Sequence, residues 1–148
     1  MRLYTPVRLE FVVQDLPPKK DGAQSMWGKS LEADRLIALR QAALAAFSKE
    51  TPLNKSIKLK IEIHVGAVNH KSTGDLDNFI TGICDGLMAA VARSTINEKW
   101  SNPSLKDIHP HKKLIIEDDC EVISIEARKI IGGSEDPCYR VVIEGFCH

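Results

Sequence analysis

The sequence predicts an α/β fold of the α+β type, formed as one domain over residues 1–148 with two main helices. Three observations predict it. Apolar residues alternate along 57–65, an alanine-rich run with helical spacing covers 31–47, and extended runs gather after residue 113. Because one hydrophobic core serves a chain of 148 residues, a single compact unit is expected.

The first half of the chain contains two strands and the first helix. Residues 7–13 are rich in β-branched and apolar side chains, and Pro17 and its neighbouring proline end this strand. Ser30 is a suitable N-cap for a helix over 31–47, which has a broad apolar face. Along 57–65 the odd positions are apolar and the even ones polar, which indicates a half-buried strand.

The second half contains another helix and three extended runs. Helical spacing of apolar residues predicts a helix over 77–92. The irregular segment 93–113 is longer than an ordinary connection in a compact domain. Extended runs follow at 114–116, 121–131 and 139–146, and the last two are expected to form a hairpin.

The composition restricts the classes of protein to consider. No apolar run approaches the ~20 residues of a membrane span, and the N-terminus lacks the pattern of a secretory signal, so we expect a cytoplasmic protein. The cysteines have no C-x-x-C spacing, so reduced thiols are expected, and a zinc site with nearby histidines is the weaker alternative. These residues are Cys84, Cys120, Cys138 and Cys147, with His109, His111 and His148.

The charge balance does not favour nucleic-acid binding by itself. Twenty basic and twenty acidic residues give a formal net charge of zero, whereas phosphate affinity normally comes from excess Lys and Arg. Local lysine clusters could still bind DNA, beginning with Lys19, Lys20 and Lys29 in a loop. Trp100 in the irregular segment could stack on an unpaired base, but packing against its own domain is the preferred interpretation.

Two acidic clusters carry the chemical signal. Asp75, Asp77 and Asn78 crowd the start of the second predicted helix, and Asp118 with Asp119 follows a short apolar run. Helix capping and a solvated turn remain open as structural interpretations of these residues. Magnesium prefers hard oxygen ligands, so an Asp pair with a distant third Asp suits a Mg²⁺ site that activates water for attack on phosphorus.

The stretch Asp75-Leu76-Asp77-Asn78, followed by Asp85-Gly86-Leu87 and then by Asp118-Asp119, resembles the RusA family of Holliday junction resolvases. The resemblance covers roughly the whole chain in element order. It implies a mixed β-sheet of about four to five strands and a homodimer that resolves four-way DNA junctions by paired symmetric nicks, with Mg²⁺ as cofactor.

The resemblance also implies roles for individual residues. Asp75, Asp77 and Asp119 are the implied catalytic metal ligands, with Asp118 as a neighbouring acid at the metal. The residues expected to contact DNA are Lys19, Lys20, Lys29, Lys71 and Asn78. Two symmetric incisions in a two-fold junction are most simply made by a two-fold dimer, which supports the homodimer independently.

This sequence departs from the family pattern at two places. Thr81 stands where the family has a lysine, and the segment 93–113 is longer than the family connection. An alternative hypothesis is therefore a catalytically weak or inactive dimer of the same fold that binds branched DNA. A third, a phosphohydrolase for small molecules, would need a deep pocket rather than a broad basic surface.

Overall fold

The computed structural model describes residues 3–20, 25–48, 51–68, 70–133 and 135–148. Its centre is a four-stranded mixed sheet in the order β1-β4-β2-β3, in which β2 and β3 are parallel and the other pairs antiparallel. The strands are β1 (Thr5–Val13), β2 (Lys55–Val65), β3 (Val122–Ile131) and β4 (Cys138–Cys147). The predicted α+β fold with a mixed sheet is confirmed.

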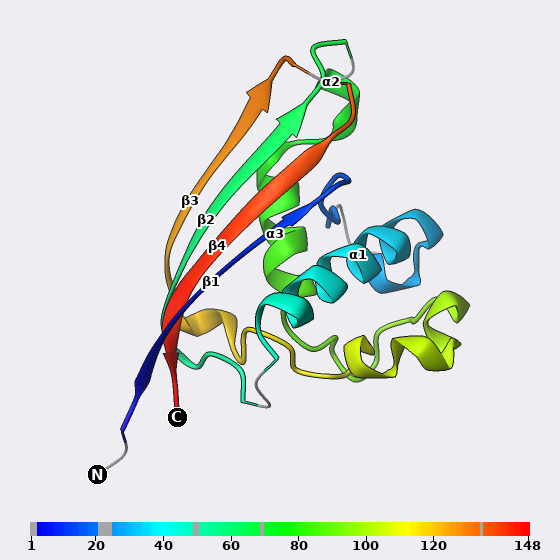
Figure 1. Ribbon diagram of the computed structural model, residues 1–148. Coiled ribbons are helices and arrows are strands. Elements are labelled where there is room, and N and C mark those ends of the chain that lie inside the picture. Colours follow the sequence, from blue (N-terminus) through cyan, green and yellow to red (C-terminus); the bar gives the residue numbers. More distant parts are fainter. Residues whose placement is uncertain (1–2, 21–24, 49–50, 69, 134) are drawn as a thin grey trace.

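Two long helices cover one face of this sheet (Figure 1). They are α1 (Ser30–Ala46) and α3 (Leu76–Gly86), and the short helix α2 (His70–Thr73) precedes α3. Short 3-10 helices occur at η1 (Met26–Gly28), η2 (Glu98–Ser101), η3 (Pro103–Ile108) and η4 (Asp119–Glu121). None of the helices in the described ranges has the length and apolar character needed to cross a membrane.

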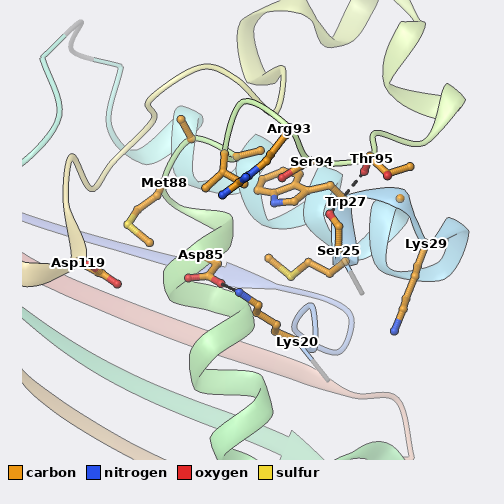
Figure 2. Close-up of a pocket in the computed structure, with 15 residues that line it drawn as sticks. Lys20, Ser25, Trp27, Lys29, Asp85, Met88, Arg93, Ser94, Thr95 and Asp119 are labelled. Atoms are coloured by element: carbon orange, nitrogen blue, oxygen red, sulfur yellow. Dashed lines mark hydrogen bonds and ion pairs between the residues drawn. The ribbon is translucent and has the colours of Figure 1, made fainter. Parts of the chain in front are cut away.

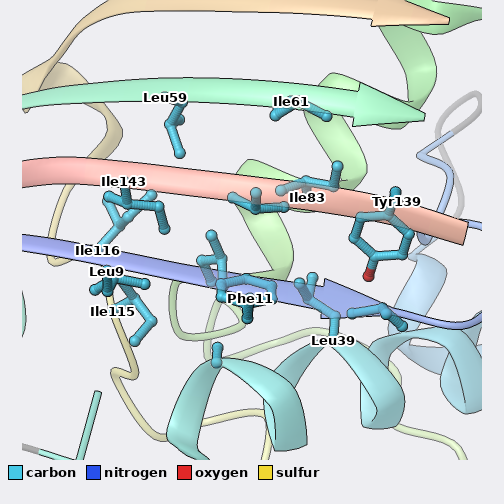
Figure 3. Close-up of a cluster of buried hydrophobic side chains, with 14 of the residues drawn as sticks. Leu9, Phe11, Leu39, Leu59, Ile61, Ile83, Ile115, Ile116, Tyr139 and Ile143 are labelled. Atoms are coloured by element: carbon cyan, nitrogen blue, oxygen red, sulfur yellow. The ribbon is translucent and has the colours of Figure 1, made fainter. Parts of the chain in front are cut away.

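The core lies between the sheet and these helices (Figure 3). The odd-numbered side chains of β2 from residue 57 to residue 65 are almost fully buried there, as their alternation predicted. They pack with buried residues of β1, β4, α1 and α3, which include Leu9, Phe11, Leu39, Ile83, Tyr139 and Ile143. Apolar burial on this face therefore fixes the position of α3, which carries the candidate site.

The predicted hairpin of the last two strands is wrong. β4 lies between β1 and β2, whereas β3 pairs with β2 alone and forms an edge of the sheet. The physical reason is burial. Residues such as Val142 are buried even on the face without helices, so β4 suits a central position, while Ile123 and Ile125 of β3 remain exposed as expected at an edge.

Both predicted helices differ from the structure in their bounds, by one residue at each end of α1 and mainly at the C-terminal end of α3. Ser30 is the first residue of α1 rather than its cap, because the carbonyl of Lys29 accepts the first helical hydrogen bond, from Ala33 N–H. The second helix stops at Gly86 instead of continuing to residue 92. It stops because the buried guanidinium of Arg40 binds the carbonyl oxygens that follow.

Arg40 is a buried structural residue that the sequence patterns did not predict. Its guanidinium donates to five backbone carbonyls, at distances of 2.7 to 2.9 Å. The acceptors belong to Gly86, Met88, Ile108, His109 and Lys112. Burial lowers the pKa of Arg40 to about 10. The long segment after α3 is thus fastened to α1 by one side chain.

The segment 93–113 packs on the outer side of α1. Trp100 is 2% exposed and lies 5.8 Å from Trp27, centroid to centroid, which confirms the packing interpretation. Residues 114–116 are buried but form only an isolated bridge, between Leu53 and Ile116, so the strand predicted there is wrong. The N–H group of Ile116 binds the carbonyl of Leu87 instead.

Candidate functional site

The first acidic cluster lies at the N-terminal end of α3, as its motif predicted. Gly74 has φ +137°, which lets the chain turn from α2 into the new helix. Asp75 is the N-cap residue, but its side chain makes no capping hydrogen bond, and Asp77 follows in the first turn. Both carboxylates are exposed, so they are available to a ligand beyond any capping role.

Lysine side chains approach this end of α3 from two other elements. Lys129 Nζ, from β3, donates to the carbonyl oxygens of His70 at 2.6 Å and Gly74 at 3.0 Å. Lys19 lies against the same turn, since a Cβ placed on Gly74 would be 2.9 Å from its Cδ. A cation is therefore present beside the acidic pair although Thr81 carries none.

Lys129 was not among the predicted site residues. Its signal was present, because Lys129 pairs with Ile63 and so belongs to the row of β3 residues that faces the helices. Ile125 and Ala127 precede it in that row. A lysine in an otherwise apolar row requires buried acceptors, and here they are backbone carbonyls at the start of the candidate site.

The segment that carries Lys19 and Lys20 runs along α3. A Cβ on Gly82 would overlap the carbonyl of Pro18, so this contact requires glycine. Lys20 N–H donates to the carbonyl of Asn78 at 3.2 Å, and Lys20 Nζ pairs with Asp85 at 2.9 Å. The predicted DNA-binding residues Lys20 and Asn78 are thus neighbours on one side of α3.

The second acidic cluster lies at the opposite end of α3. Asp118 caps η4, and the hydrogen bond from Cys120 N–H at 3.1 Å holds the pKa of Asp118 below its ordinary value. Asp119 and Asp85 line the same hollow, with Asp85 beside Lys20 (Figure 2). Burial, with the charges of Asp85 and Asp119, raises the pKa of Cys84 to about 11.

The structure does not bring the two acidic clusters together within one chain. Asp77 and Asp85 are eight residues apart on a helix, which corresponds to about 12 Å along its axis. Parallel pairing explains the separation, because Ile57 opposite Val122 aligns the starts of β2 and β3, whereas α3 begins beyond the end of β2. In the described ranges no three His, Cys, Asp or Glu residues form a group that could hold one metal ion.

The remaining candidate lysines have different surroundings. Lys29 lines the hollow that Asp119 also lines, and Lys71 is exposed on α2. Two lysines outside the predicted set pair with acidic residues away from α3: Lys99 with Asp34 at 2.9 Å, and Lys113 with Glu117 at 3.5 Å. Thr81 donates its hydroxyl to the carbonyl of Asp77. All four cysteines are free thiols, as expected.

No protein-family model and no curated protein matches the chain. A solved structure to which it is similar is the crystal structure of a HypE-HypF complex, at a TM-score of 0.37 and 11% sequence identity. The match covers 98% of this chain and 33% of that one, so the chain spans about a third of that protein. At this level the similarity carries no functional argument, and the assignment must rest on the residues.

Proposed function

We propose that this chain is a cytoplasmic, homodimeric endonuclease that cuts branched DNA, with four-way junctions as substrate and Mg²⁺ as cofactor. The observation that supports it best is the arrangement at the start of α3. There the exposed Asp75 and Asp77 follow a turn that Lys19 and Lys129 approach. Carboxylates beside lysines are suited to a phosphodiester, since the ammonium groups attract the phosphate.

The metal part of this proposal needs more than one chain. A single chain does not present the expected ligand set, because Asp119 lies at the far end of α3 from Asp75 and Asp77. If the three carboxylates act on one ion, a second copy must supply Asp119. In a two-fold dimer each subunit would then complete the site of the other.

A DNA-binding protein without nuclease activity is the second candidate. The distance between the two acidic clusters along α3 favours it. A dimer that keeps its two acidic clusters apart, with Thr81 in place of a lysine, would bind a junction through its lysines and leave it uncut. Expected affinity then falls with rising salt, because lysine contacts to phosphate release counterions.

A labelled synthetic four-way junction distinguishes these candidates. The protein is incubated with it in the presence and absence of Mg²⁺, beside the Asp77→Asn variant and an Asp107→Asn control, whose carboxylate is exposed in η3. Paired nicks that require Mg²⁺ and disappear only with Asp77→Asn support the nuclease. A gel shift without nicks supports the binding protein, and hydrolysis of a small phosphate ester without junction binding would overturn both.

A further inference from the structure

The outer edge of β3 has no neighbouring strand within the described ranges (Figure 1). The N–H group of Gly132, directly after β3, donates to the carbonyl of Val65 in β2 at 3.0 Å. Backbone groups alternate in direction along a strand, so those of the odd-numbered residues of β3 point away from β2. This edge therefore presents N–H and C=O groups that a further strand can bind.

The side chains at the same edge are incompletely covered. Ile123, Ile125 and Ile131 are 60%, 42% and 51% exposed, although Ile125 and Ile131 belong to the row that faces the helices. At the opposite edge of the sheet, Leu9 and Phe11 in the corresponding row of β1 are buried. The edge at β3 thus lacks the cover that the other edge has, which is typical of a surface that associates with a partner.

The sequence of β3 is complementary to itself when two copies run in opposite directions. If Ala127 lies opposite its own equivalent, Glu126 lies opposite Arg128, and Ile123 lies opposite Ile131. Opposite charges and apolar side chains that face each other across a ladder stabilise it, whereas like charges destabilise it. Moving the axis by one residue in either direction would put Glu126 or Arg128 opposite itself. The charges therefore select the register about Ala127.

Charged side chains on the face of the sheet without helices form rows that stop at this edge. One row alternates in sign through Glu10, Arg140, Glu62 and Arg128. A second row consists of Lys60 and Glu126, 4.0 Å apart. The self-complementary register joins the positive end of the first row to the negative end of the second row in the other copy. Charge complementarity therefore favours a second copy of this chain as the partner of β3.

We propose that β3 pairs antiparallel with β3 of a second copy, with Ala127 on the two-fold axis, so that the two sheets become continuous. This inference rests on the proposed function and names the surface through which the homodimer forms. Ile125 then lies opposite Lys129, whose apolar methylene chain leads to the turn before Asp75. The same pairing brings η4 of one copy to the end of the sheet at which α3 of the other begins.

Glu126→Arg and Arg128→Glu test the charge pairs by sedimentation equilibrium. Each variant alone puts like charges opposite each other twice in its homodimer, so its dissociation constant should rise by roughly 10-fold or more. Mixing the two variants restores both pairs, because residue 126 of each copy then faces a residue 128 of opposite charge, and a heterodimer should form with nearly the wild-type dissociation constant. Glu144→Arg is the control, since Glu144 is exposed on the central strand β4 and should leave the dimer unchanged.

Cysteine cross-linking tests the position of the axis. In an antiparallel two-fold pair only the residue on the axis lies opposite its own equivalent, so Ala127→Cys should form an intermolecular disulfide under mild oxidation. Ser124→Cys on the same strand is the control, because its two copies would lie about 20 Å apart along the strands. Both variants carry Cys120→Ser to remove an exposed natural thiol. Circular dichroism verifies that every variant is folded.

The outcomes separate this inference from the function beneath it. A wild-type dimer that Glu126→Arg weakens no more than Glu144→Arg, that mixing fails to restore, or that Ser124→Cys links as fast as Ala127→Cys would overturn the inference alone. A wild-type chain that stays monomeric at every concentration would overturn both the inference and the proposed homodimer. Junction cleavage is assayed separately, so a dimer of the expected register that neither binds nor cuts junctions would overturn only the proposed function.

Discussion

The guanidinium of Arg40 in α1 donates a hydrogen bond of 2.7 Å to the carbonyl oxygen of Gly86, the last residue of α3. A cation at this position binds the negative end of the helix dipole as well as an otherwise unpaired carbonyl. Four further carbonyls share the same guanidinium. The end of the helix that carries the candidate site is therefore positioned by a side chain from another element.

Replacing Arg40 with methionine should destabilise the fold by at least about 3 kcal/mol, because the side chain is buried and its five carbonyl acceptors would each lose a short hydrogen bond. Urea unfolding followed by circular dichroism measures the change. Arg128→Met is the control, since Arg128 is an exposed partner of Glu62 and should cost no more than about 1 kcal/mol. Equal losses in the two variants would contradict the structural role of Arg40.

Gly82→Ala should destabilise the fold by about 2 kcal/mol or more, although alanine is the better helix former. The reason is steric, because the new Cβ would overlap the carbonyl of Pro18. Thr81→Ala, one residue earlier and exposed, is the matched control and should be nearly neutral. A Gly82→Ala protein as stable as wild type would show that residues 17–20 do not lie against α3.

Mixed dimers test whether Asp119 acts from a second copy. Subunits carrying Asp77→Asn and Asp119→Asn are co-expressed with different tags, and the heterodimer is isolated. If each site combines Asp77 of one copy with Asp119 of the other, one site of the heterodimer is intact, and it should nick one junction strand. If both carboxylates of a site come from one copy, the heterodimer should be inactive.

Lys129→Met should reduce junction cleavage by ten-fold or more, because the turn into Asp75 loses the ammonium group that binds the carbonyls of His70 and Gly74. Hydrogen exchange of the α2 backbone should rise in the same variant. Lys58→Met alters an exposed lysine on the strand next to β3 and serves as control. Unchanged exchange and cleavage would exclude a positioning role for Lys129.

The thiol of Cys84 gives a prediction about pH. Its pKa in the fold is raised from 9.0 to about 11, mainly by burial, so between these values the folded chain keeps a proton that the unfolded chain has lost. The free energy of unfolding therefore keeps its full value with respect to Cys84 below pH 9. It should fall by up to about 2 kcal/mol as the pH rises through 11. Cys84→Ala should flatten the decline of unfolding free energy measured over this range. An unchanged decline would contradict the shift.

Local sequence patterns predicted which segments form helices and strands, but they did not predict which strands pair with one another. The alternation along β2 and the apolar face of α1 were readable because each reflects burial of one face. The position of β4 was not readable, since it depends on which strand can be buried on both faces. The end of α3 was also missed, because the residue that terminates it lies in α1.

In the candidate site too, the local position of the residues was predicted and their arrangement in space was not. The motif placed Asp75 and Asp77 at the start of a helix, and the structure places them there. The expectation that Asp119 would join them assumed that the end of one strand meets the start of that helix. Parallel pairing of β2 and β3 instead puts Asp119 at the opposite end of α3, and pairing direction leaves no local trace in the sequence.

The central place of β4 also has a consequence for biosynthesis. Thr5 pairs with Cys147, so the strand made first by the ribosome finds its partner only after the rest of the fold has been translated. Until β4 emerges, β1 lacks its strand partner and cannot join the pair formed by β2 and β3, so its apolar face stays open to aggregation. Correct assembly of this sheet should therefore depend on slow translation or on chaperones.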